Sequence, residues 1–326
     1  MTSPVSGRGA GQEWSRRDFV SGLGAFFLSS VLLPRTLRGA DLSPDLKPLR
    51  LGFLTDIHAM AEMNAPAWME SSAVLMNSLQ PDLIIGGGDF VHGGFQSSGP
   101  VMDSRWKLAS TFLEKLRAPL QPVIGNHDFY EPLKSDGTPA PGDPRRRWKE
   151  HFGLPSTYRS FPWKGYRFLV LDSVQVIGGR ERYEGRIDEP QLAWLDRELA
   201  VIPRNEPIIL CTHIPFRTAL MSAAPELFGG AGRIRVLNSD RVMEKLRDRP
   251  VALILQGHVH LNERLSEGQI PCITGGAVCG KWWKGPNMGT APGLGLIEIL
   301  PAASSPSAVP AWSYSDTPAP VTTGAA

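Results

Sequence analysis

Two histidines, His258 and His260, directly follow an apolar run late in the chain. The run, residues 252–255, has the composition of a buried strand. In an extended chain, residues i and i+2 point to the same face, so both imidazoles would aim at one point just past the strand end. Such a pair suits a metal ion, for which imidazole is a common ligand. The alternative is two histidines on an ordinary loop.

The same arrangement recurs at four other apolar runs, each of which closes on a polar side chain able to bind a metal. These runs are residues 49–58, 81–90, 121–130 and 207–216. In chain order, the candidate ligands are Asp56, His58, Asp89, Asn126, His213, His258 and His260. In open α/β sheets, sites form beyond the carboxyl ends of the strands. Because five of the 7 histidines lie at these ends, we interpret the set as one metal site.

The ligand types indicate which ions and which chemistry fit. Asp, His and Asn without a thiolate favour first-row ions such as Mn, Fe or Zn. Seven ligands are too many for one ion and divide into two sites, with Asp89 at a glycine turn as the expected shared carboxylate. Two divalent ions together with Asp56 and Asp89 would keep about two net positive charges, which suits a phosphate group. Such a pair of ions also lowers the pKa of a bound water.

The elements that position these residues alternate between strands and helices. Helices are predicted at residues 66–80, 103–117, 188–200 and 238–248, and a further strand at 167–174. This alternation favours an α/β fold with largely parallel sheets. We expect one domain over residues 48–300. The tail, residues 301–326, is rich in Pro, Ala, Ser and Thr and is predicted to be disordered.

Composition narrows the choice of partners. The chain has 326 residues and a net charge of +2, which argues against a protein that binds long nucleic acid. The charge run 143–150 is interpreted as a solvated loop or a helix start, with phosphate steering as the alternative. Three cysteines leave at least one unpaired. Cys211 has the setting of a core residue, and pairing of Cys272 with Cys279 is open but not favoured.

The first 40 residues have the features of an export signal. Arg16 and Arg17 precede an apolar stretch, residues 19–33, which is short of the ~20 residues that a membrane-spanning helix needs. The arginine pair resembles a twin-arginine signal, which predicts the twin-arginine machinery as a partner and a periplasmic or secreted location. Cleavage after Ala40 is open, because Arg38 fits the cleavage site poorly. An amphipathic N-terminal anchor is the alternative, and no stable membrane span is expected.

The ordered series D-x-H, G-G-D, G-N-H-D, T-H-I-P and G-H-x-H, over residues 49–300, resembles the calcineurin-like metallophosphoesterase superfamily. The resemblance implies a four-layer α/β/β/α sandwich with a dimetal site at the carboxyl ends of the strands. It also implies two ligand sets: Asp56, His58, Asp89 and His260 for one ion, and Asp89, Asn126, His213 and His258 for the other. His127 would face the phosphate, as a general acid to the leaving oxygen or as a charge stabiliser.

Differences from the motifs of particular branches narrow the choice of branch within the superfamily. The stretches GDFVHGG and GNHD differ from the G-D-x-x-D-R-G and G-N-H-E of the protein Ser/Thr phosphatases. His92 stands where that branch has an aspartate, as it does in relatives that repair DNA breaks, so it either assists the leaving group or is an ordinary loop residue. Phe90 and His92 occupy the neighbourhood in which purple acid phosphatases have a tyrosine ligand, which argues against a site of that type.

A glycine-rich loop after the last candidate ligands carries Trp282 and Trp283. Buried packing is the default interpretation, and an apolar wall for the substrate, flanked by Lys281 and Lys284, is the alternative. The sequence as a whole predicts an exported dinuclear-metal phosphoester hydrolase in which a metal-bound hydroxide attacks phosphorus in line. A small phosphodiester is the favoured substrate. The alternatives are a phosphomonoesterase, a nuclease and a non-catalytic metal-dependent binding scaffold.

Overall fold

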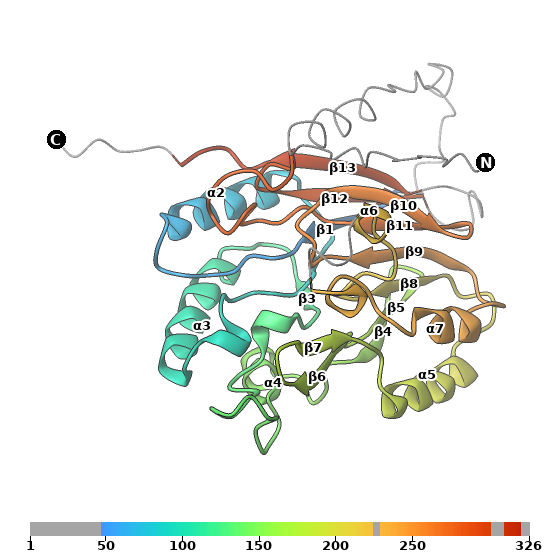
Figure 1. Ribbon diagram of the computed structural model, residues 1–326. Coiled ribbons are helices and arrows are strands. Elements are labelled where there is room, and N and C mark those ends of the chain that lie inside the picture. Colours follow the sequence, from blue (N-terminus) through green and yellow to red (C-terminus); the bar gives the residue numbers. More distant parts are fainter. Residues whose placement is uncertain (1–46, 224–228, 301–309, 321–326) are drawn as a thin grey trace, which may run out of the picture. The chain divides into compact units, whose positions relative to one another are not determined.

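The computed structural model of the chain describes residues 47–223, 229–300 and 310–320. The expected export signal, residues 1–40, lies outside the described residues, as do residues 301–309 and 321–326 of the tail. Within the described part, two β-sheets lie face to face (Figure 1). No helix in that part is both long and apolar enough to cross a membrane.

The first sheet has five strands in the order β13-β12-β1-β2-β3. These strands are β1 (Leu49–Leu54), β2 (Leu83–Gly86), β3 (Leu120–Pro122), β12 (Gly293–Ile299) and β13 (Ala311–Asp316). β1, β2 and β3 run parallel, whereas β12 is antiparallel to β1, and β13 to β12. The carboxyl ends of the three parallel strands therefore meet at one edge of the sheet, where the first candidate ligands follow them.

The second sheet has six strands in the order β10-β11-β9-β8-β5-β4. They are β4 (Arg159–Trp163), β5 (Tyr166–Val170), β8 (Ile208–Cys211), β9 (Val251–Gln256), β10 (Glu263–Glu267) and β11 (Ile270–Thr274). Its four central strands are parallel, and the two edge strands, β4 and β10, are antiparallel. The sheets are thus mixed, parallel at the centre and antiparallel at the edges. A separate two-stranded ribbon pairs β6 (Val174–Gly178) with β7 (Arg182–Gly185).

An apolar layer fills the space between the two sheets. Successive side chains of a strand point to opposite faces. In β5, Phe168 and Val170 therefore lie in this inner layer, while Leu169 belongs to the outer core. Strands that are apolar on both faces must be covered on both sides.

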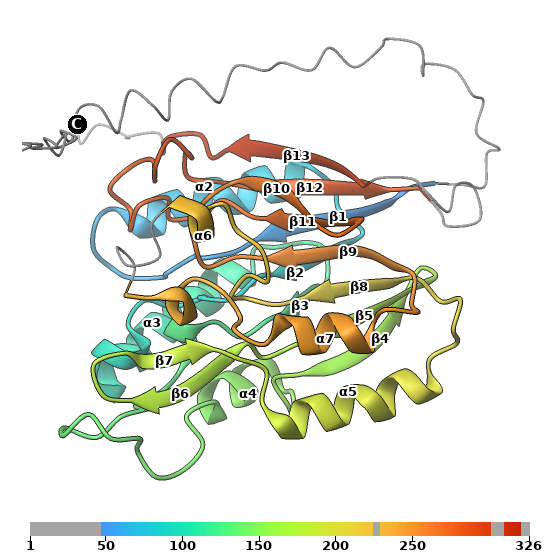
Figure 2. The same cartoon turned by 45° about the vertical axis from the view of Figure 1, so that its right-hand side comes forward.

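Helices supply the outer cover. They are α2 (Ala65–Ser78), α3 (Gly99–Leu113), α4 (Arg146–Phe152), α5 (Glu189–Val201), α6 (Leu220–Ala223) and α7 (Ser239–Lys245). Met76 of α2 and Leu195 of α5 are fully buried in the outer core. α5 and α7 lie on the side of the six-stranded sheet (Figure 2). The order helix, sheet, sheet, helix confirms the four-layer α/β/β/α sandwich.

The tail contains a strand, which corrects the expectation that residues 301–326 are disordered throughout. Strand β13 pairs with β12 along its whole length. The Trp312 ring lies 6.3 Å from that of Phe53, and the Tyr314 hydroxyl donates to the Ala291 carbonyl at 2.7 Å. The domain therefore continues beyond residue 300. The short aromatic alternation WSYS was masked by the surrounding Pro, Ala and Ser residues.

Candidate metal centre

The structure brings all seven candidate ligands together at the carboxyl edge of the two sheets. Asp56 and His58 follow β1, Asp89 follows β2, and Asn126 begins the 3-10 turn η2 (Asn126–Asp128) after β3. His213 follows β8, and both His258 and His260 follow β9. Six of the seven side chains are buried, and His258 is half-buried.

Five of these residues have a left-handed backbone, which side chains other than glycine rarely adopt. They are Asp56 (φ 54°), His58 (φ 48°), Asp89 (φ 55°), His258 (φ 74°) and His260 (φ 55°). The extended geometry expected for the 258–260 pair is therefore wrong. The two imidazoles do not aim at one point, because each left-handed turn redirects its own side chain. Such strain, ~1–3 kcal/mol for each residue, persists only where the surrounding structure over-determines it.

One cluster forms around the ring of His58. Its Nε2 atom lies 3.2 Å from Nε2 of His260 and 3.5 Å from Oδ2 of Asp89. Oδ1 of Asp56 lies 3.3 Å from the same His260 nitrogen. Ligands bound at about 2.1 Å to a shared ion would be separated by about 3.4 Å in tetrahedral geometry, close to these distances.

A second cluster lies on the other side of Asp89. Nε2 of His213 is 3.3 Å from Oδ2 of Asp89 and 3.2 Å from Oδ1 of Asn126. A ring nitrogen of His258 completes a group with Asp89 and His213 in which all ligand atoms lie within 4.8 Å of one another. Oδ2 of Asp89 therefore lies in both clusters, as expected for a shared carboxylate.

Backbone carbonyls fix which ring nitrogen of each histidine faces the clusters. The Nδ1 atoms of His213 and His260 lie 2.8 Å and 2.6 Å from the carbonyls of Gly87 and Gly280, and Nε2 of His258 lies 2.7 Å from that of Arg233. A ring N–H that donates to a carbonyl leaves the opposite nitrogen as the available ligand atom, a recurrent second-layer feature of metal sites. His258 would therefore bind through Nδ1, and the other two through Nε2.

Unpaired buried atoms provide a direct test of whether these residues fit a metal ion. Oδ2 of Asp56 accepts hydrogen bonds from the Thr55 hydroxyl and the His258 backbone N–H, whereas Oδ1 is buried and accepts no hydrogen bond from the described residues, although imidazole nitrogens lie near it. A buried carboxylate oxygen without a donor is costly. Since it points toward a cluster of imidazole nitrogens, the donor set fits a cation.

Asp128, whose role the sequence analysis did not address, holds the turn that presents Asp89. Its carboxylate accepts backbone N–H groups from Asp89, Phe90, Val91 and Gly125 at 2.7–3.3 Å. These bonds tie the end of β2 to the end of β3. The last residue of the G-N-H-D stretch was the available signal.

His213 predicts how the affinity for metal changes with pH. Burial lowers its pKa, but the charge of Asp89 and the hydrogen bond to that carboxylate outweigh this effect and raise the pKa to about 9. In the metal-free protein His213 is therefore protonated at neutral pH, and metal must displace this proton. We expect the apparent affinity to rise with pH up to about pH 9, where His213 loses its proton. Chelator competition at pH 6.5, 7.5 and 8.5 measures this, and an affinity independent of pH would contradict it.

His127 lies beside the clusters with a defined orientation. Its backbone N–H donates to Oδ1 of Asp89 at 2.7 Å, and its Nδ1 accepts the backbone N–H of Gly93 at 3.1 Å. An Nδ1 that accepts a hydrogen bond carries no proton, so the neutral ring holds its proton on Nε2. Its ring lies 4.6 Å from that of His58, between centroids. His127 thus presents an N–H donor at the centre.

His92 also belongs to the centre. Its ring centroid is 5.4 Å from that of His127, and its Nδ1 atom is buried without a partner in the described part of the chain. Burial, followed by the charge of His58, lowers its pKa to about 4. The Arg105 guanidinium donates to the His92 carbonyl at 2.8 Å and so fixes this loop. The sequence analysis did not identify Arg105 as a residue of the site.

The two neighbouring tryptophans have different surroundings. Trp283 is buried, and its indole N–H donates to the His58 carbonyl at 3.0 Å, which agrees with the packing interpretation. Trp282 is 37% exposed and contacts the histidines of the centre. The three cysteines are buried and free, and Sγ of Cys279 lies 3.8 Å from Nδ1 of His260.

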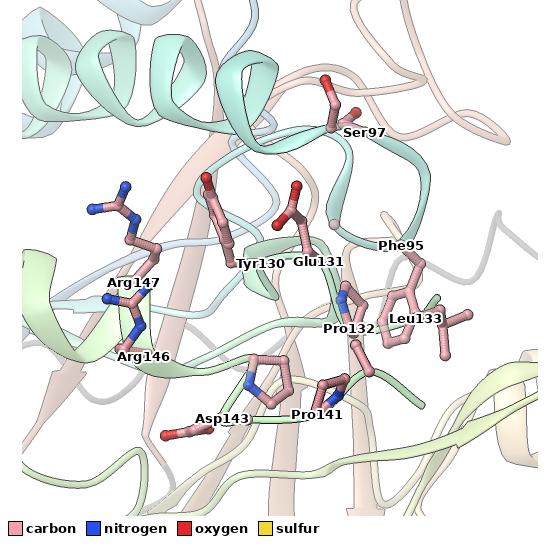
Figure 3. Close-up of a pocket in the computed structure, with 15 residues that line it drawn as sticks. Phe95, Ser97, Tyr130, Glu131, Pro132, Leu133, Pro141, Asp143, Arg146 and Arg147 are labelled. Atoms are coloured by element: carbon pink, nitrogen blue, oxygen red, sulfur yellow. The ribbon is translucent and has the colours of Figure 1, made fainter. Parts of the chain in front are cut away.

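A cavity of about 540 Å³ lies between the 3-10 turn η1 (Gly94–Gln96), the start of α3 and residues 130–147. Figure 3 shows it lined by Tyr130 and the two arginines at the start of α4. Its lining residues include none of the seven candidate ligands and neither His92 nor His127. The cavity is therefore a neighbour of the metal centre and not part of it.

The arginines of the charge run 143–150 are paired. Arg145 forms a partly buried ion pair with Asp172 at 2.5 Å, while Arg146 and Arg147 lie 3.1 Å and 3.6 Å from Glu150. This pairing agrees with the interpretation of the run as a helix start, since it precedes and opens α4.

Comparisons with known proteins agree with the fold and the motifs. A family model described as calcineurin-like phosphoesterase matches residues 49–262. The chain is 28% identical over 222 residues to the 3',5'-cyclic adenosine monophosphate phosphodiesterase CpdA of Escherichia coli. The aligned region covers 65% of this chain and 70% of the relative. It is 31% identical over 217 residues to a "Probable cyclic nucleotide phosphodiesterase" of Rhodopseudomonas palustris, covering 64% and 70% of the two chains.

Among solved structures, a dimetal phosphatase from Danio rerio shares the fold. Its TM-score is 0.57 at 15% identity, over 77% of this chain and 93% of that chain. The chain belongs to the calcineurin-like phosphoesterases and is a metal-dependent phosphoester hydrolase.

Proposed function

We propose that the chain is a dinuclear-metal phosphodiesterase that acts on small phosphodiesters, with cyclic nucleotides as the first class to test. One ion would be held by Asp56, His58, Asp89 and His260, and the other by Asp89, Asn126, His213 and His258. The observation that carries this assignment is the position of Oδ2 of Asp89, 3.5 Å from His58 Nε2 and 3.3 Å from His213 Nε2. Mn, Fe and Zn all match the donor types.

When bound, such a pair of ions activates a water molecule and neutralises the phosphate oxygens. The chain's own residues do the rest. His127 donates a hydrogen bond from Nε2–H to the phosphate or the departing oxygen. Full proton transfer by the imidazolium form would require a second proton on Nδ1, where the Gly93 N–H already points. Of its two expected roles, charge stabilisation therefore fits better than general acid catalysis.

The substrate class rests on two supports. The similar proteins named above are cyclic nucleotide phosphodiesterases by name. The near-balanced charge, +2 over the whole chain, suits a small substrate better than a long nucleic acid.

The test compares hydrolysis of bis(p-nitrophenyl) phosphate, 3',5'-cyclic AMP and p-nitrophenyl phosphate by Mn-loaded protein. We expect kcat/KM for the diesters to exceed that for the monoester, and turnover to be lost in His258→Ala. His151→Gln is the matched control, because that ring packs on Trp106, away from the centre. A preference for the monoester would make the protein a phosphatase. Two bound metals without turnover of any substrate would favour a binding scaffold.

Export by the twin-arginine route to the periplasm or medium is a further part of the proposal. Its support is the Arg16–Arg17 pair ahead of the apolar stretch 19–33. We expect the full chain to appear outside the cytoplasm on cell fractionation. Replacing both arginines by lysine should retain it inside, and export that ignores this substitution would exclude the route.

A further inference from the structure

The indole of Trp282 lies against four histidines of the metal centre. Its ring centroid is 4.4 Å from that of His58, 4.9 Å from His260, and 5.2 Å from both His127 and His92. Two of these histidines are candidate metal ligands, and the other two are those expected to face the phosphate. The ring therefore lies where the organic part of a bound phosphoester would extend from the phosphorus atom toward solvent.

The loop that carries this ring is closed on itself. The Lys281 N–H donates to the Gly285 carbonyl at 2.8 Å, and the Trp283 N–H to the Cys279 carbonyl at 2.8 Å. The buried Trp283 indole is anchored to the His58 carbonyl. The backbone on both sides of Trp282, a residue that is 37% exposed, is thus fixed, which limits the freedom that the side chain can lose when a ligand binds.

The backbone of this loop is strained at the tryptophans. Trp282 and Trp283 both have a left-handed backbone, with φ of 54° and 63°. Glycine would adopt this conformation without penalty. Strained residues other than glycine cluster at ligand-binding positions, where the side chain has a use. For Trp283 that use is the bond to His58, whereas Trp282 makes ring contacts with the histidines and keeps part of its surface exposed.

From this geometry we infer that Trp282 is a specificity-determining residue, a fixed aromatic platform on which a planar group of the substrate, such as a nucleobase, stacks. The inference rests on the proposed function for the identity of the reacting group, a phosphoester. A base gains affinity by stacking on an aromatic side chain with little dependence on which base it is. Trp282 would accordingly select for a planar substituent and not for one nucleotide.

Binding of two monoesters tests the platform without turnover of a diester. Titration calorimetry of Mn-loaded protein with 5'-AMP and with ribose 5-phosphate compares ligands that share the phosphate and sugar but differ in the base. We expect 5'-AMP to bind wild-type protein at least about tenfold more tightly. Trp282→Ala should remove this preference while leaving the affinity for ribose 5-phosphate within about threefold, and Trp282→Phe should keep part of it. Met288→Ala, a change at an exposed position later in the same loop, should behave as wild type.

Three outcomes would overturn the inference. The first is that wild-type protein binds the two ligands with equal affinity. The second is that Trp282→Ala weakens the binding of both ligands equally, which would indicate a structural role, and the third is that it tightens the binding of both equally, which would mean that the ring only obstructs the centre. Failure of the proposed function is a separate result. In that case the protein would hydrolyse no phosphodiester and still prefer 5'-AMP through Trp282.

Discussion

Asp89→Asn is expected to lower kcat/KM for phosphodiesters by about 10³-fold or more and to reduce the number of bound metal ions. Its Oδ2 atom lies in both ligand clusters, so the loss of one negative charge weakens both sites at once. Oδ1 also accepts the His127 N–H, so the change disturbs the presentation of that ring. A pair of bound metal ions supplies several kcal/mol of charge stabilisation in the transition state. Each ~1.4 kcal/mol that is lost lowers the rate by a factor of ten.

Metal content after dialysis, measured by plasma mass spectrometry, should be read beside the rate. Asp136→Asn is the matched control, because that carboxylate is exposed and bonds only to Thr138 among the described residues. We expect the control to keep the wild-type metal content and rate. Two tightly bound ions with nearly normal turnover in Asp89→Asn would refute the shared-carboxylate assignment.

His127→Gln is expected to show the second-largest effect, a fall in kcat of about 10²–10³-fold with both metals retained. His127 supplies an N–H donor next to the clusters without belonging to either ligand set. The glutamine amide can still donate a hydrogen bond but lacks the fixed direction that the Gly93 N–H imposes on the ring. The separation of metal content from turnover distinguishes this variant from changes to the ligands.

Steady-state kinetics on bis(p-nitrophenyl) phosphate, with metal analysis of the same sample, measures this effect. His151→Gln serves again as the control. Turnover within a fewfold of wild type would remove His127 from the catalytic machinery, and loss of metal would place it among the ligands.

The ligand set was predictable because its motifs are short and each follows an apolar strand. Asp56 and His58 are two residues apart in the chain, and the strand before them is fully recognisable from its composition. Spacing, however, does not give direction. His258 and His260 have a left-handed backbone, and the His258 N–H donates to Asp56 at the end of a strand of the other sheet, a long-range contact that no local pattern reveals.

Long-range partners account for the other differences. Trp282 and Trp283 are adjacent and chemically identical, yet one is anchored below His58 and the other is partly exposed. Strand β13 depends on pairing with β12 and would have little reason to be ordered by its own composition. Asp128 is visible in the sequence as the last residue of G-N-H-D. Its partners, backbone N–H groups at the end of β2, are far away in the chain and are not visible there.

The pairing of β1 with β12 has a consequence for how the chain folds. Leu49 lies opposite Ile299, so one edge of β1 can pair only after nearly the whole chain is available to supply β12. Closing so long a loop costs entropy that local contacts cannot offset early, and topologies of this kind fold slowly. Asp56 and His260 likewise come from distant parts of the chain and meet only when the two sheets have come together. Acquisition of the metal pair should therefore be one of the last steps of folding, so that a loaded centre marks a finished chain.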